Sequence, residues 1–207
     1  YGYLPDAIVV EGPKAGGHLG FKKEQIEDEH YSLEHLIPEV VEVARSYAGR
    51  KNIPVIAAGG IATGEDIARF MALGASAVQM GSIFVPTEEC DASVEFKKVY
   101  LNAHREDIRI IQSPVGMPGR AFDGEFIRNV AEGKEKPRSC PFHCIKTCDY
   151  TKSPYCIIKA LYNAAKGNMK KGYAFAGGNA YLSDKIRSVR EVVEKLKTDF
   201  FLSKAAF

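Results

Sequence analysis

Three short apolar runs near the beginning of the chain constrain its fold more than any other feature. They occupy residues 6–12, 53–58 and 77–81, and each ends in or leads into glycine. Nearly continuous apolar strands of this length are typical of a parallel sheet that is covered on both faces. The segments between them have helical periodicity. The order strand, helix, strand, helix, strand therefore predicts an α/β fold with parallel strands joined by right-handed crossovers.

The two intervening helices can be bounded from their end signals. The first is predicted to begin after Ser32 and to end near Gly49. The second is predicted to begin after Thr63, which can cap its N-terminus, and to end at Gly74. The residues expected to face inward are Leu33, Leu36, Ile37, Val40, Val41 and Ala44 in the first helix, and Ile67, Phe70 and Met71 in the second.

The pattern changes after residue 85. We predict a helix at 93–103, a strand at 108–112 and an irregular stretch as far as residue 139, where proline, glycine and charged residues dominate. A further helix is predicted between an N-cap at Ser153 and a stop at Gly167. The last helix is predicted at about 183–200, with Ile186, Val189, Val193 and Leu196 on one face.

Composition excludes several classes of protein. The 207 residues include 28 Lys and Arg against 26 Asp and Glu, which gives a formal net charge of +2. This balance, without a long basic block, argues against a surface for nucleic acid or anionic membranes. No apolar run reaches the roughly 18 residues of a transmembrane helix, and no signal peptide is recognisable. A cytoplasmic location is the resulting expectation.

Two strand ends are candidates for binding phosphate. Residues 58–61 and 79–82 end consecutive buried strands with small residues, whose backbone N–H groups can approach an anion closely. In (β/α)₈ barrels, the loops after the seventh and eighth strands frequently bind phosphate. The candidate residues are Gly59, Gly60, Gln79, Met80, Gly81 and Ser82. The alternative is that the glycines only permit tight turns.

A third glycine-rich segment follows the first apolar run. Gly16 and Gly17 would allow the main chain to lie flat against a planar ligand, and His18 would stand beside that ligand. Histidine is suited to proton transfer near neutral pH. The alternative is a loop histidine that is hydrogen-bonded to backbone. The histidines at 30, 35 and 104 lie in charged or helical surroundings and are expected at the surface.

These segments together resemble the nitronate monooxygenase family, formerly called 2-nitropropane dioxygenases, which includes flavin-dependent enoyl-acyl-carrier-protein reductases. The resemblance rests on residues 15–20, 53–61 and 74–82, and more weakly on the small-residue turn at 175–180. It implies a TIM barrel that holds FMN non-covalently, with His18 as the catalytic histidine. It places Glu11, Gly16 and Gly17 against the flavin, Gly59 and Gly60 in the first phosphate turn, and Gln79, Met80, Gly81 and Ser82 in the second.

On this basis the three apolar runs would be strands six to eight of the barrel. A complete barrel takes about 250 residues, so we predict that this chain alone cannot close one and is the C-terminal part of a longer fold. We expect three segments: residues 1–90 as barrel, residues 91–172 as a mostly helical or irregular addition, and residues 173–207 as a return to the barrel with a C-terminal helix.

Four of the five cysteines lie in the added segment, at positions 140, 144, 148 and 156. Thiolates are the usual ligands of zinc and of iron–sulfur clusters. The spacing is not that of common zinc sites, however, and Pro141 disfavours a helix there. Disulfides are unexpected in the cytosol. Ordinary reduced thiols are therefore favoured, no metal ligand is assigned, and a metal is left open.

The function implied by the resemblance is an FMN-dependent oxidoreductase that oxidises alkyl nitronates with O₂. The alternative within the family is an enoyl-acyl-carrier-protein reductase that uses NAD(P)H as co-substrate. The phosphate turns alone also permit a flavin-free barrel enzyme, such as an isomerase acting on a sugar phosphate, because fold does not determine function. A metal-binding interaction module built on the cysteines is a further alternative, and a homodimer is left open.

Overall fold

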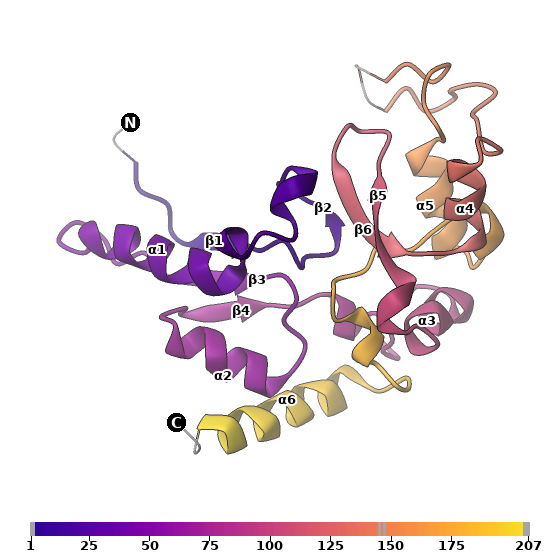
Figure 1. Ribbon diagram of the computed structural model, residues 1–207. Coiled ribbons are helices and arrows are strands. Elements are labelled where there is room, and N and C mark those ends of the chain that lie inside the picture. Colours follow the sequence, from indigo (N-terminus) through magenta and orange to yellow (C-terminus); the bar gives the residue numbers. More distant parts are fainter. Residues whose placement is uncertain (1–2, 145, 147, 205–207) are drawn as a thin grey trace.

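The predicted parallel sheet is present in the computed structural model, which describes residues 3–144, 146 and 148–204. Its strands are β1 (Ile8–Glu11), β3 (Val55–Ala58) and β4 (Ala77–Gln79), in the order β1-β3-β4 (Figure 1). Both neighbouring pairs are parallel. The α/β order of elements predicted from the apolar runs is therefore confirmed.

Two helices cover one face of this sheet. Helix α1 (Leu33–Ser46) buries Leu33, Ile37, Val41 and Ala44, all of which were predicted to face inward. Helix α2 (Gly64–Ala72) begins after Thr63 as predicted and buries Phe70. Met71 is 42% exposed, so its predicted inward position was wrong. Helical periodicity defines an apolar face about 100° wide. Phe70 lies within the part of that face that contacts the sheet, whereas Met71 lies at its margin.

The opposite face of the sheet is open in the described part of the chain. The strand register places Val9, Ile56 and Ala77 in one row. Val9 is 50% exposed and Ala77 is exposed. The strands were predicted to be buried on both faces, and that prediction was wrong here because no layer of the described residues covers this side. The three parallel strands do not close a barrel, as we predicted.

A second sheet lies beside the first and is antiparallel. Its strands are β2 (Gly17–His18), β6 (Pro118–Phe122) and β5 (Ile108–Gln112), in the order β2-β6-β5. Strand β5 was predicted. Strand β6 and helix α4 (Glu125–Ala131) were missed, because they lie in the stretch expected to be irregular. Pro118 and Gly119 disfavour a strand locally, and pairing with both neighbours overrides that preference.

The second sheet has a core of its own. Helix α5 (Ile157–Ala165) and α4 pack against it around Phe126, Tyr155 and Tyr173. The N-cap of α5 is Cys156, three residues after the predicted Ser153, whereas Gly167 does follow its end. Helix α3 (Val94–Leu101) buries Tyr100 in an adjoining core. Short 3₁₀ helices lie at Lys23–Gln25, Glu29–Tyr31, Ser82–Phe84, Arg105–Asp107, Met169–Lys171 and Ala180–Leu182.

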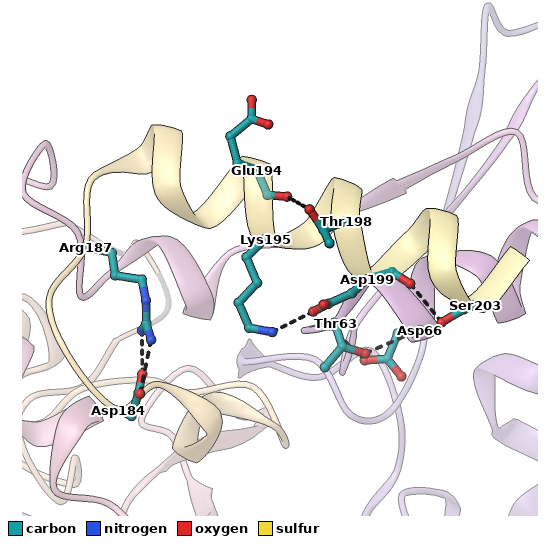
Figure 2. Close-up of polar contacts among 9 residues, drawn as sticks. All are labelled: Thr63, Asp66, Asp184, Arg187, Glu194, Lys195, Thr198, Asp199 and Ser203. Atoms are coloured by element: carbon teal, nitrogen blue, oxygen red, sulfur yellow. Dashed lines mark hydrogen bonds and ion pairs between the residues drawn. The ribbon is translucent and has the colours of Figure 1, made fainter.

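Helix α6 (Val189–Lys204) returns to the first sheet and lies along α2 (Figure 1). It begins and ends later than predicted. The segment before it is held by an ion pair between Asp184 and Arg187 (Figure 2). An isolated β-bridge also pairs Arg187 with Thr87. A side chain at Gly64 would lie 2.3 Å from the backbone nitrogen of Phe200, so the two helices meet backbone to backbone.

The surface of α6 carries a Lys195–Asp199 pair at 2.6 Å, spaced one helical turn apart (Figure 2). Such exposed pairs contribute a few tenths of a kcal/mol, so packing against α2 is the larger stabilising term for this helix. Among the described residues, no helix combines the length and the apolar character that crossing a membrane requires.

Candidate functional site

A cavity of about 310 Å³ lies at the carboxyl ends of β1, β3 and β4. This is the edge at which parallel α/β sheets bind ligands. All of the predicted binding residues line it: Glu11, Gly16, Gly17, Gly59, Gly60, Gln79, Met80, Gly81 and Ser82. The fold thus brings together residues that are up to 71 positions apart in the sequence. Their roles in binding stay predictions.

Part of the cavity wall is main chain, because Gly16, Gly59 and Gly60 cannot take a side chain without collision or backbone strain. A side chain at Gly16 would lie 2.6 Å from the nitrogen of Gly177 and 2.7 Å from the carbonyl carbon of Ala176. Gly59 and Gly60 have φ values of +97° and +77°, which L-residues with a side chain rarely adopt. A ligand in the cavity therefore meets backbone atoms directly.

Several backbone N–H groups at the cavity are available to an acceptor. In the described part of the chain, the N–H groups of Gly60, Ile61 and Gly81 donate to no protein atom. By contrast, the amides of Ala62 and Thr63 at the start of α2 donate to the carboxylate of Asp66, at 2.9 and 3.2 Å. Asp66 thus occupies donors that an anion at the helix N-terminus would use, and the glycine turns are the free donors.

The segment from Phe175 to Ala180 forms a second wall, and no residue in it was assigned from sequence. The N–H of Gly177 donates to Ser82 Oγ at 2.9 Å, and Asn179 Nδ2 donates to the carbonyl of Gly60 at 2.5 Å. These bonds join the wall to the ends of β3 and β4. The small-residue turn was the available signal, but its partners are roughly 95–120 positions away and cannot be read locally.

His18 lies next to the cavity rather than among the residues that line it in the described structure. It belongs to β2, where it pairs with Gly119, so the predicted loop position was wrong. Its Nε2 is 2.7 Å from Ser113 Oγ, and its ring meets the edge of Phe175 with centroids 5.0 Å apart. Phe175 lines the cavity, and Ser113 is 2% exposed. Sequence reasoning missed both partners.

Burial changes the acid–base properties of groups at the cavity. Desolvation raises the pKa of the Glu11 carboxyl, which is the ionisable carboxyl among the described lining residues. Burial also raises the pKa of Tyr100, whose hydroxyl donates to the carbonyl of Phe175 at 2.6 Å. Tyr100 therefore remains neutral and holds the backbone of Phe175 in place. Phe175 lines the cavity and contacts His18, so this bond helps to fix that part of the cavity wall.

A second cavity of about 630 Å³ shares Gly59, Gly60 and Asn179 with the first. It is lined by side chains of both charges, including Arg120. Burial lowers the pKa of Arg120, and its guanidinium donates to the carbonyl of Pro13 at 2.7 Å. The Gly59–Gly60 turn therefore separates a cavity lined by free amides from one lined by charged side chains.

Together these features define a class: a parallel α/β fold whose strand ends form a glycine-rich cavity with free backbone N–H groups. The nitronate monooxygenase family profile matches residues 2–199. The chain belongs to the nitronate monooxygenase family.

Known relatives agree with this assignment. A probable nitronate monooxygenase of Staphylococcus aureus is 34% identical over 128 residues, which are 61% of this chain and 34% of that protein. The structure is similar to FabK from Thermotoga maritima, with a TM-score of 0.71, 30% identity and coverage of 97% of this chain and 56% of the other. For nitroalkane oxidase from Streptomyces ansochromogenes these values are 0.70, 26%, 97% and 53%. The chain thus spans about a third of its curated relatives and about half of these structures.

Proposed function

We propose that the 310 Å³ cavity binds FMN and that the protein oxidises alkyl nitronates with O₂. The observation that carries this proposal is the meeting of two glycine turns with free N–H groups at one cavity in a member of this family. Backbone amides without β-carbons suit the FMN phosphate, because they approach an anion closely without adding charge.

The lining of the cavity also supports binding of the planar isoalloxazine ring of FMN. Gly16 and Gly17 present a side-chain-free backbone on one wall, and a β-carbon at Gly16 would collide with the main chain behind it. When bound, FMN supplies the redox chemistry, whereas the protein orients it and controls its surroundings. Glu11, Gln79, Met80 and Ser82 complete the proposed contacts.

His18 acts in this proposal as the proton acceptor for neutral nitroalkanes. In the tautomer in which Nε2–H donates to Ser113 Oγ, this bond holds the ring beside Phe175 and leaves Nδ1 with the lone pair that accepts the proton. An oriented imidazole can remove the proton from the carbon that bears the nitro group. A substrate supplied as the nitronate anion has already lost this proton and does not need His18 as a base.

An enoyl-acyl-carrier-protein reductase is the second candidate, favoured by the similarity to FabK from Thermotoga maritima. In that function NAD(P)H would be the reductant, and His18 would donate a hydrogen bond or a proton to the thioester carbonyl. The flavin-free sugar-phosphate enzyme stays as an alternative function, and the possible homodimer stays open, because no specific contact favours either.

Two measurements test these candidates on the protein at its natural length. After titration with FMN and removal of unbound flavin, the protein is expected to stay yellow, with quenched flavin fluorescence in the complex. A protein that is colourless after this removal would contradict the flavin proposal. Oxygen uptake with a nitronate and without nicotinamide supports the first function. Oxidation of NAD(P)H with a crotonyl thioester, without activity on nitronates, would establish the second instead.

A further inference from the structure

Four cysteines that lie within residues 140–156 line one small pocket. Cys140, Cys144, Cys148 and Cys156 all border it, together with Tyr155 and Ile157 at the start of α5. All four thiols are free. Their spacing and the proline after the first did not predict this meeting, and the described residues between 140 and 156 form no helix through the cysteines.

The segment that carries these cysteines lacks the regular hydrogen bonding of helices and strands in its described part. In the described part of residues 132–156, no helix or strand forms, and Cys144 and Cys148 are exposed. Irregular connections longer than about 12–15 residues are uncommon in compact domains unless they are functional or held by additional bonds. Metal–thiolate bonds can supply such stabilisation, because metal binding is coupled to folding.

We propose that these four cysteines ligate an iron–sulfur cluster. Four cysteine thiolates are the usual ligands of a [4Fe–4S] centre. Among the described residues, no three His, Cys, Asp or Glu side chains are grouped closely enough to hold a single metal ion. In a cluster each thiolate binds a different iron, so four cysteines that border one pocket without grouping around a single point suit a cluster better than one zinc ion. Each thiol releases its proton as its sulfur bonds to iron.

The surroundings of the pocket fit such a centre. Pro114, Pro137 and Ile157 provide apolar walls, and a hydrophobic shell limits the access of water to a metal site. The Ser153 hydroxyl lies 3.1 Å from the carbonyl oxygen of Asp149 and 3.5 Å from Cys148 Sγ, so its one hydrogen can turn from that carbonyl to a ligating sulfur. These contacts surround the thiols with the groups that stabilise a cluster.

The pocket is connected to the candidate site by a column of aromatic side chains. Tyr155 borders the pocket, and its ring centroid is 5.7 Å from that of Tyr173. Tyr173 lies 5.0 Å from Phe175, which borders the 310 Å³ cavity. A cluster at the cysteines therefore holds the outer end of the column that positions Phe175 beside His18.

The test is chemical analysis of the protein at its natural length, purified without oxygen and reconstituted with ferrous iron and sulfide. We expect about four iron atoms and about four acid-labile sulfides per chain. Dithionite reduction should produce an electron paramagnetic resonance signal. Iron and sulfide are assayed chemically because bound FMN would absorb in the same visible range, which also makes the result independent of the flavin proposal.

Cysteine variants show whether the iron belongs to this pocket. Cys144→Ser and Cys148→Ser are expected to lose iron and sulfide, whereas the matched control Cys90→Ser, which lies outside the pocket, retains both. Circular dichroism checks that the variants remain folded. Zinc in place of iron, iron that persists in both variants, or no metal in the reconstituted wild-type protein would overturn the proposal.

Discussion

Different kinds of contact build the glycine-lined cavity and the aromatic region next to His18, which consists of Phe126, Tyr155, Tyr173 and Phe175. At the cavity, main chain meets main chain, as where Gly16 approaches Gly177. In the aromatic region, side chains from separate segments meet, as where the ring of Tyr155 packs on those of Phe126 and Tyr173. A site built from backbone is marked in the sequence by glycine, whereas one built from side chains depends on which distant segments pair.

The largest expected effect comes from adding a side chain to the main-chain contact. Gly16→Ala places a β-carbon 2.6 Å from backbone that cannot move away easily. Overpacking of this kind costs about 1–3 kcal/mol, and the segment can relieve it by shifting into the cavity. Bound FMN would block that shift, so the Kd for FMN should rise about 10- to 100-fold. Flavin fluorescence titration measures it. Gly20→Ala, in the same segment but with open space around it, is the control. Equal FMN affinity in both variants would show that backbone approach does not define the cavity.

A second contact between main chains joins α2 and α6 and lies outside the cavity. Adding a side chain at this contact should lower the free energy of unfolding. Gly64→Ala would place its β-carbon 2.4 Å from the carbonyl oxygen of Leu196. We expect the free energy of unfolding in urea to fall by about 1–3 kcal/mol. Gly124→Ala has open space around it and should change stability much less. Unchanged stability in the Gly64 variant would mean that α6 does not pack on α2 as described.

The side-chain region is tested at the His18–Ser113 hydrogen bond. Ser113→Ala removes the partner of His18 Nε2, and we expect kcat/KM for a neutral nitroalkane to fall about 10-fold with a changed pH profile, because loss of orientation forfeits part of general-base catalysis. Activity on the nitronate anion should be preserved, and Ser113→Thr should restore the first activity. If both substrates lose activity equally, Ser113 has only a structural role.

The smallest expected effect is the pH dependence due to Glu11. Its pKa is raised in the folded state by desolvation, so the ionised form opposes folding above the unfolded pKa, and the penalty is absent at lower pH. Glu11→Gln should therefore stabilise the protein slightly at neutral pH and not near pH 3. Water reaches this exposed side chain, so the gain should be below about 0.5 kcal/mol. Urea unfolding at both pH values measures it, and destabilisation at neutral pH would contradict this.

Local sequence patterns predicted the glycine-lined cavity and the elements around it well. Strand period, helix period and end signals placed β1, β3, β4, α1 and α2, and glycine indicated the residues that line the cavity. The same reasoning missed β6, because Pro118 and Gly119 disfavour a strand when considered alone. Sequence analysis also placed the start of α6 too early. The contacts of Arg187 with Asp184 and Thr87 keep the residues before Val189 out of the helix.

The sequence by itself determined the parallel strands and the glycine turns, since apolar periodicity and a missing β-carbon act within a few residues. Only the tertiary structure decided that Ser113 would reach His18 and that four separate thiols would line one pocket. The physical reason is that these contacts follow from long-range strand pairing, as between β2 and β6, and from a segment without regular secondary structure in its described part. Neither leaves a periodic signal in the chain.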